Sequence, residues 1–130
     1  MRNSQNEPIG AELRGTGRHV WRGLARGSQK DSGFFAVKPK SYSSIVLCES
    51  AIDAISCFIL NPTFCCISTS GARHKPSWLP NIIASNLNVY CAFDADSTGD
   101  TMANAMIANY PSIQRLRPSA HDWNDLLKSQ

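Results

Sequence analysis

Two hydrophobic patterns follow one another along the chain, and the change falls near residue 43. Before it, short alternating stretches at 19–22 and 34–37 stand among many glycines, which predicts short strands and hairpins. After it, continuous apolar runs alternate with helix-like segments, as expected for buried strands followed by helices. The pattern predicts a basic, glycine-rich β extension at 1–40 packed on an α/β domain at 41–130.

The second part of the chain repeats a strand and helix unit. The predicted strands are 45–48, 64–67, 88–93 and 113–116, and the predicted helices are 51–60, a weaker one within 77–86, one from the turn at 94–99 to about Tyr110, and 122–128. Such alternation predicts a mainly parallel sheet of about four strands with right-handed crossovers. A flavodoxin-like order, second-first-third-fourth, would make the first and third strands neighbours.

Acidic residues stand where two of these strands end. Glu49 directly follows the first strand, and Asp94 and Asp96 follow the third. Ligands of such sheets bind beyond the carboxyl ends of the strands, so the three carboxylates are expected to meet there. Crowded carboxylates repel one another unless a cation compensates them, and magnesium prefers oxygen ligands. The sequence therefore predicts a magnesium site in which Glu49 moves a proton during phosphoryl transfer.

A structural explanation exists for each acid taken alone. Asp94 or Asp96 could cap the helix that follows, and Glu49 could do the same for the helix at 51–60. Three acids at the ends of two buried strands are harder to explain in this way, because unpaired buried charge is costly. The shared site is the better explanation of the set.

Three segments of the sequence resemble one known family. Residues 49–54 (ESAIDA), 68–71 (STSG) and 93–99 (FDADSTG) resemble, in order and spacing, the Toprim domain of bacterial-type primases, topoisomerases and some nucleases. The opening at 10–15 and the closing stretch at 121–127 are similar to the Toprim-like branch found in primases and mobilisation proteins of plasmids and mobile elements. The resemblance implies a Toprim (Rossmann-like) fold, Glu49 as catalytic acid or base, and Asp94 and Asp96 as ligands of Mg²⁺, with Mn²⁺ as a substitute.

Two further acids are candidate members of the site. Asp53 lies one helical turn after Glu49 and could share its side, although a salt bridge explains it equally well. Asp122 could be another acid near the site or the cap of the last helix.

Basic residues are concentrated at the front of the chain. Residues 1–40 hold eight Lys or Arg against three acids, and residues 41–130 hold five against seven, which makes up the net charge of +3. Such a distribution suits a polyanion held near a metal. The candidate phosphate and nucleic-acid contacts are Arg14 and Arg18, from a run of arginines spaced by four, together with Gly71, Arg73 and Lys75 after the second strand. A solvated basic edge explains the same residues.

The five cysteines and the three tryptophans are expected to serve packing. The cysteines are odd in number, lie in or beside apolar runs and lack Cys-x-x-Cys spacing, which predicts buried free thiols and a reducing cytoplasm. Trp21, Trp78 and Trp123 are expected in the core or half-buried. No apolar run is long enough to predict a membrane helix.

Two other interpretations of the acidic turn fit less well. An EF-hand loop starting at Asp94 would place Gly99 correctly but has Ala105 at its twelfth position, where Glu is expected. A dehalogenase-type phosphatase would leave Glu49 unused. The Toprim resemblance implies primase-like nucleotidyl transfer in DNA replication or mobilisation, on DNA more than RNA, with a helicase or another replication protein as partner. A Toprim-type nuclease and a non-catalytic nucleic-acid-binding or scaffolding module are the alternatives.

Overall fold

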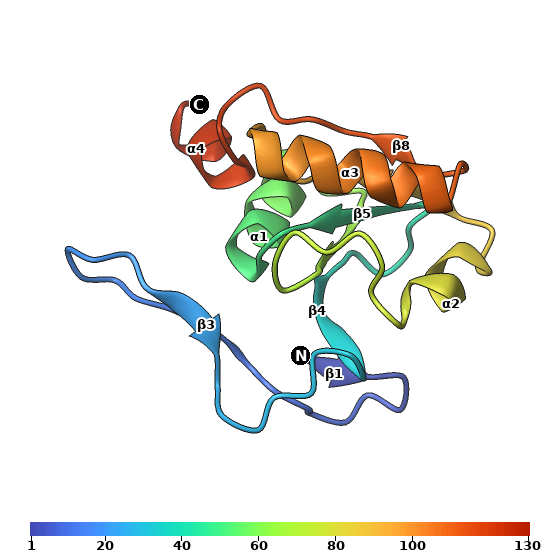
Figure 1. The fold of residues 1–130 in the computed structure, drawn as a ribbon, viewed down its shortest axis with the longest axis horizontal. Coiled ribbons are helices and arrows are strands. Elements are labelled where there is room, and N and C mark those ends of the chain that lie inside the picture. The colour runs from blue at the N-terminus through green and yellow to red at the C-terminus, as the bar shows by residue number, and fades with distance from the viewer.

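The computed structural model describes residues 1–130 and shows one six-stranded sheet (Figure 1). Its strands, in spatial order, are β1 (Arg2–Asn3), β4 (Gly33–Val37), β6 (Cys65–Ser68), β5 (Ser44–Cys48), β7 (Asn88–Cys91) and β8 (Gln114–Arg115). The four from β6 to β8 are parallel, and their order is the predicted one. The sheet is larger than four strands because β4 pairs antiparallel with β6 and β1 pairs antiparallel with β4.

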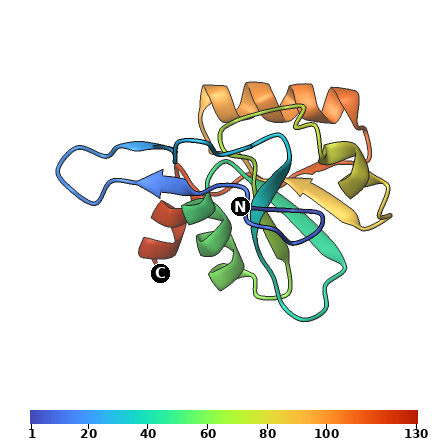
Figure 2. The ribbon, with the colours of Figure 1, turned by 90° about the horizontal axis from the view of Figure 1, so that it is seen from below.

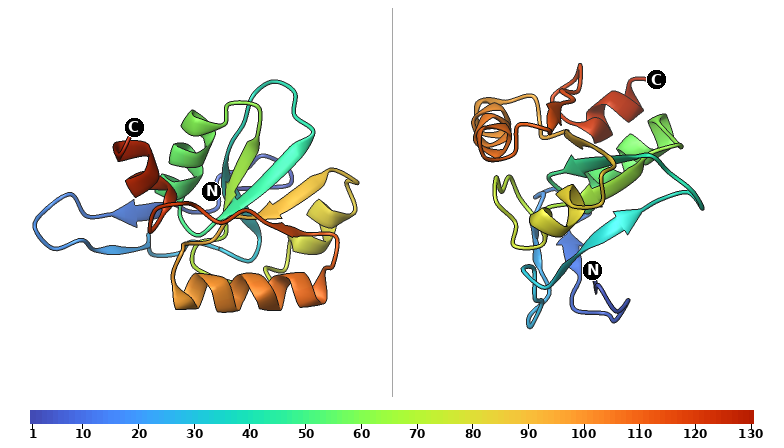
Figure 3. Two further views of the ribbon diagram at one scale, coloured as in Figure 1. Left: turned by 90° about the horizontal axis from the view of Figure 1, so that it is seen from above. Right: turned by 90° about the vertical axis from the view of Figure 1, so that its right-hand side faces the viewer.

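Helices cover both faces of this sheet (Figure 3). α1 (Ala51–Leu60) and α4 (Trp123–Lys128) lie on one face, and α2 (Leu79–Ile83) and α3 (Ser97–Asn109) lie on the other. Strand β5 is buried on both sides, since Leu47 packs in the cluster with α2 and α3 while Val46 packs in the cluster with α1 and α4. All four predicted helices are present, and none in the chain is long and apolar enough to cross a membrane.

A separate hairpin projects from the body (Figures 1 and 2). It consists of β2 (Glu12–Arg14) and β3 (Arg22–Leu24), which form a two-stranded antiparallel sheet. The arginines spaced by four therefore lie neither on a helix nor on one unbroken strand. Arg14 and Arg22 are opposite each other across the ladder, and Arg18 lies in the connecting turn.

The packing expectation holds for the cysteines and for two of the tryptophans. All five cysteines are free and buried, as predicted. Trp78 and Trp123 are buried, at 7% and 5% exposed. For Trp21 the expectation is wrong, because the projecting hairpin leaves its side chain 57% exposed.

Candidate functional site

Glu49 and Asp94 meet at the carboxyl ends of β5 and β7. These strands are adjacent and parallel, and the pairing continues beyond β7 through the Ala92 N–H, which donates to the Leu47 carbonyl at 2.8 Å. The next step along the chains brings Glu49 Oε1 to the backbone N–H of Asp94, which donates to it at 3.1 Å. Neighbouring parallel strands thus place the two acids side by side.

Asp96 and Asp122 each cap a helix and still present a second oxygen to the same imidazole. Asp96 Oδ1 accepts from the Gly99 N–H at 2.7 Å at the start of α3, and Asp122 Oδ1 accepts from the Asp125 N–H at 2.7 Å at the start of α4. Oδ2 of Asp96 and Oδ2 of Asp122 each lie 3.7 Å from a ring nitrogen of His121. Helix capping and membership of the cluster are therefore compatible for both residues.

Three side chains are arranged so that one ion could contact all of them. Asp94, His121 and Asp122 each offer a ligand atom, and these atoms lie within 4.8 Å of one another. Asp94 Oδ1 is buried without a hydrogen-bond partner, which is costly for a carboxylate oxygen. Carboxylate oxygens with one imidazole suit Mg²⁺ or Mn²⁺, so the donor set fits a divalent cation.

His121 was not predicted as a site residue. His121 lies close to the acids because the Ala95 N–H donates to its carbonyl at 2.7 Å, which connects the turn after β7 to the loop before α4. Its only signal in the sequence is its position next to Asp122 in the closing motif.

Asp53 also belongs to this group of charges. Its side chain is 5% exposed, and one oxygen accepts a hydrogen bond from the Ser50 hydroxyl at 2.5 Å. Ser50 in turn caps α1, so the residue after Glu49, rather than Glu49 itself, is the cap. Asp53 forms no salt bridge, and its charge acts on Glu49 and Asp94.

The acids raise one another's pKa values. Burial raises the pKa of Asp94 to about 7, with Glu49, Asp53, Asp122 and Asp96 contributing in that order. Burial also raises the pKa of Glu49, against the lowering effects of the Asp94 N–H and the Arg22 charge. The pKa of Asp53 is raised mainly by burial too. The region carries more negative charge than its surroundings neutralise, which favours a bound cation.

Two arginines hold the turn after β7 in place. Arg115 donates to the carbonyls of Cys91, Phe93 and Asp94 at 3.2, 2.8 and 3.1 Å. Both Arg115 and Arg117 bond Asp100, at 2.8 and 3.0 Å, and the two guanidinium groups hold its pKa at about 2.

Gly99 is required for the close approach of α3 to this turn. A Cβ at position 99 would lie 2.2 Å from the Asp94 carbonyl oxygen. Only glycine therefore allows the helix to begin directly against the backbone of Asp94.

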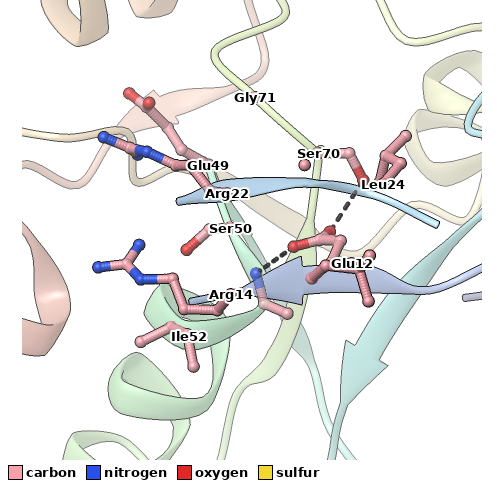
Figure 4. A pocket seen from close by; sticks show the side chains of 12 residues that line it. Glu12, Arg14, Arg22, Leu24, Glu49, Ser50, Ile52, Ser70 and Gly71 are labelled. Carbon is pink, nitrogen blue, oxygen red and sulfur yellow. Dashed lines mark hydrogen bonds between the residues drawn. The ribbon is translucent and has the colours of Figure 1, made fainter. Parts of the chain in front are cut away.

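A pocket of about 270 Å³ lies between the hairpin and the acidic edge of the sheet, which is the end of β5 and β7 that carries Glu49 and Asp94 (Figure 4). Glu12 closes one end, because its carboxylate accepts from the Ala51 N–H at 2.7 Å, from the Ser70 hydroxyl at 2.8 Å and from the Ser68 hydroxyl. Arg14 and Arg22 line the pocket, and their charges act on Asp53 and Glu49, respectively. Glu12 was not predicted as a site residue, since its role depends on contacts distant in sequence, whereas Arg22 belongs to the run of arginines spaced by four.

The loop after β6 contributes Gly71 to this pocket but directs Arg73 elsewhere. Gly71 has a φ of 111°, and its N–H donates to the Glu49 carbonyl at 2.8 Å. The Arg73 guanidinium bonds Asp31 at 2.7 Å and the Thr69 carbonyl at 2.7 Å, which joins the loop to the segment before β4. Lys75 and Arg18 are exposed and do not line the pocket.

The fold and the site together define a class of protein: a Rossmann-like α/β domain with clustered acids at the carboxyl ends of two adjacent parallel strands. The family model described as Toprim-like matches residues 46–127. This match covers more than half of the chain, so the protein belongs to the Toprim-like family, as the sequence motifs predicted. No curated protein sequence matches the chain.

Solved structures from bacteriophage T7 share the fold. The primase fragment of the T7 primase-helicase protein aligns with a TM-score of 0.71 at 13% identity, over 98% of this chain and 56% of that one. A second T7 structure is of the lagging-strand DNA polymerase interacting with primase domains of two gp4 subunits bound to an RNA/DNA hybrid and dTTP. One of its chains aligns with a TM-score of 0.66 at 16% identity, over 98% of this chain and 68% of that one. The present chain thus spans little more than half of the primase fragment.

Proposed function

We propose that this protein is a magnesium-dependent enzyme of phosphoryl transfer on nucleic acid, with primase-like nucleotidyl transfer as its reaction. The observation that carries the proposal is the buried, unpartnered Oδ1 of Asp94 within a cluster of five acids. A structural cluster would be expected to satisfy that oxygen with a donor of the protein. An oxygen left for a cation explains both the missing donor and the excess negative charge.

The ligands in this proposal are Asp94, Asp96 and Glu49, with Asp122 and His121 as adjacent donors. A bound divalent cation would supply the positive charge that stabilises phosphate oxygens during transfer. Asp96 is suited to be a ligand, and Asp122 to be an adjacent donor, because each is fixed through one oxygen and presents the other. Ligands fixed in this way need little reorganisation on binding.

Glu49 is proposed as the acid or base. Its Oε1 is fixed by the Asp94 N–H, which leaves Oε2 to exchange a proton with the attacking or leaving hydroxyl. Its raised pKa makes the carboxylate a better proton acceptor than an exposed glutamate.

The phosphates are proposed to enter between the hairpin and the acidic edge. Arg14, Arg22 and Gly71 line the pocket there, and the two guanidinium groups form no ion pair with an acid of the chain. Charged donors without a partner suit phosphate oxygens. We propose that Lys75 and Arg18 contact phosphates further along the bound nucleic acid. Arg73 holds the loop that carries Gly71.

A partner protein is part of the proposal. The T7 relative is named a primase-helicase, and the second T7 structure is described as a polymerase interacting with primase domains. By analogy with these assemblies, we propose a helicase or another replication protein as the partner of this chain.

One incubation separates the candidate activities. Labelled single-stranded DNA, nucleotides and Mg²⁺ are expected to give primer synthesis, whereas strand cleavage would identify a nuclease and binding alone a non-catalytic module. Glu49→Gln is expected to lower turnover by about 10²- to 10⁴-fold, the usual contribution of a general acid or base. Full turnover in that variant would remove Glu49 from the mechanism.

The metal assignment has a test that does not depend on turnover. Mn²⁺ titration followed by electron paramagnetic resonance is expected to show weaker binding in Asp94→Asn, since a neutral amide replaces the buried carboxylate. Asp125→Asn is the matched control, because Asp125 is exposed and its carboxylate pairs with Lys128 at 3.5 Å. Equal Mn²⁺ affinity in Asp94→Asn and the unmodified protein would exclude this site.

A further inference from the structure

One face of the hairpin carries a single aromatic ring. The pairing Leu13 with Gly23 and Arg14 with Arg22 places alternate residues on opposite faces. Arg14 and Arg22 share the face of Glu12, which is bonded to the body. Leu13, Gly23 and Trp21 lie on the other face.

Glycines leave the ring of Trp21 uncovered. Its ring lies along the strand over Gly23, where a Cβ would be 3.2 Å from Cζ2. Across the hairpin its partner is Gly15, whose N–H donates to the Trp21 carbonyl at 2.6 Å. Because neither neighbour has a side chain, 57% of Trp21 remains exposed beside Leu13, which is 39% exposed. We call these four residues, Leu13, Gly15, Trp21 and Gly23, the hairpin platform.

The segment around the platform is strongly cationic. Residues 13–30 contain Arg14, Arg18, Arg22, Arg26 and Lys30 and no acid. All four arginines are exposed, and none takes part in an ion pair. An exposed indole in a segment that carries several unpaired guanidinium groups combines a stacking surface with charges that suit phosphate.

We propose that the hairpin platform binds single-stranded nucleic acid by stacking a base on Trp21, while the arginines of the segment contact the flanking phosphates. This inference rests on the proposed function, in that the bound strand would be the template or product of the acidic site. The hairpin projects from the body on the side toward which the β5 arrow points, the side of the acidic edge (Figure 1). A strand stacked on the platform would lie on the opposite face of the hairpin from the pocket that Arg14 and Arg22 line.

The positive charge of residues 13–30 favours nucleic acid over a second copy of the chain as the ligand of the hairpin platform. A symmetric dimer through the platform would place two acid-free arginine segments against each other, which like-charge repulsion disfavours. Duplex DNA offers its phosphates to the arginines but no free base to Trp21, whereas an unpaired strand offers both.

Tryptophan fluorescence reads the proposed contact directly. Trp78 and Trp123 are buried, so a change of emission on adding a ligand reports Trp21. At one fixed low salt concentration, an oligothymidylate is expected to quench the emission, and an abasic oligonucleotide of equal length and charge is expected to quench it far less. In a titration that follows the anisotropy of a labelled oligonucleotide, Trp21→Leu is expected to weaken oligothymidylate binding by about 5- to 100-fold and to leave abasic binding unchanged. Val20→Ser is the matched control, since Val20 is 63% exposed on the same hairpin but carries no ring.

Two results would overturn the inference: equal binding of the two oligonucleotides with unchanged emission, or an unaltered oligothymidylate affinity in Trp21→Leu. A strong preference for an acidic protein or for self-association through Trp21 would overturn it as well. The proposed function fails separately. Quenching of Trp21 without any metal-dependent turnover would refute the proposed function and leave the platform inference standing. Metal-dependent turnover with normal strand binding in Trp21→Leu would refute the platform inference and leave the proposed function standing.

Discussion

The acidic site and the hairpin are held to the molecule in very different ways. The turn carrying Asp94 and Asp96 is bonded by Arg115, Arg117 and the neighbouring strand, and its oxygens are placed by helix starts and backbone donors. The hairpin is fixed to the body chiefly through Glu12. A rigid turn suits a metal centre, which needs fixed ligands, and a lightly held arm suits a flexible strand.

Removing Arg115, which holds the turn after β7 in place, should have the largest effect. Arg115→Ala removes the side-chain donor of the Phe93 and Asp94 carbonyls and one of the two donors of the Cys91 carbonyl, and it leaves Asp100 without one partner. We expect a loss of about 1–3 kcal/mol in the free energy of unfolding and a roughly 10- to 100-fold loss of Mn²⁺ affinity, as for other residues that orient metal ligands. Denaturant unfolding and Mn²⁺ titration measure the two effects.

Arg117→Ala provides the comparison for this prediction. Its side chain is 50% exposed against 20% for Arg115, so its loss should cost clearly less. If Arg115→Ala keeps full Mn²⁺ affinity while losing stability, Arg115 supports the fold and not the metal site.

The metal site should respond to pH in the range where Asp94 titrates. With the pKa of Asp94 raised to about 7, protons compete with the metal below neutrality. Mn²⁺ affinity is expected to fall by up to about tenfold per pH unit below pH 7 and to level off above it. Asp94→Asn should flatten this dependence, and an unchanged slope in that variant would assign the titration to another group.

The same pKa has an opposite consequence for the metal-free fold. The folded-state pKa of Asp94 lies above its ordinary value of 3.8, so the folded form binds the proton more tightly than the unfolded chain does. This contribution to stability is complete below about pH 4 and is lost as the pH rises through about 7. Thermal unfolding should show that loss without metal and its reversal when Mn²⁺ is added.

Local patterns explain why much of the α/β part could be predicted from sequence. The buried strand at Ser44–Cys48 and the capped helix Ala51–Leu60 are each specified by neighbouring residues. The strand order followed from those units and general rules of connection, and it placed Glu49 next to Asp94.

Long-range contacts account for what the sequence did not reveal. Strand β4 joins the sheet through pairing of Phe35 with Ser68, and Glu12 bonds Ala51 across 39 residues of chain. Neither contact has a local signal. The exposure of Trp21 likewise depends on where the hairpin lies, because the residue type alone favours burial.

Weakening the single anchor of the hairpin should give the smallest effect and bears most directly on the comparison. Glu12→Gln keeps the size of the side chain but replaces one of its two accepting oxygens by a donor. We expect a loss of about 1 kcal/mol in stability and faster hydrogen exchange at Gly15 and Ala25, whose N–H groups close the hairpin ladder, with no change at Ala92 beside the acidic turn. Glu7→Gln is the matched control, because Glu7 is exposed and bonds only Asn3. If Glu12→Gln instead accelerated exchange equally at Ala92, the hairpin and the acidic site would open as one unit, and the division between a rigid centre and a lightly held arm would be wrong.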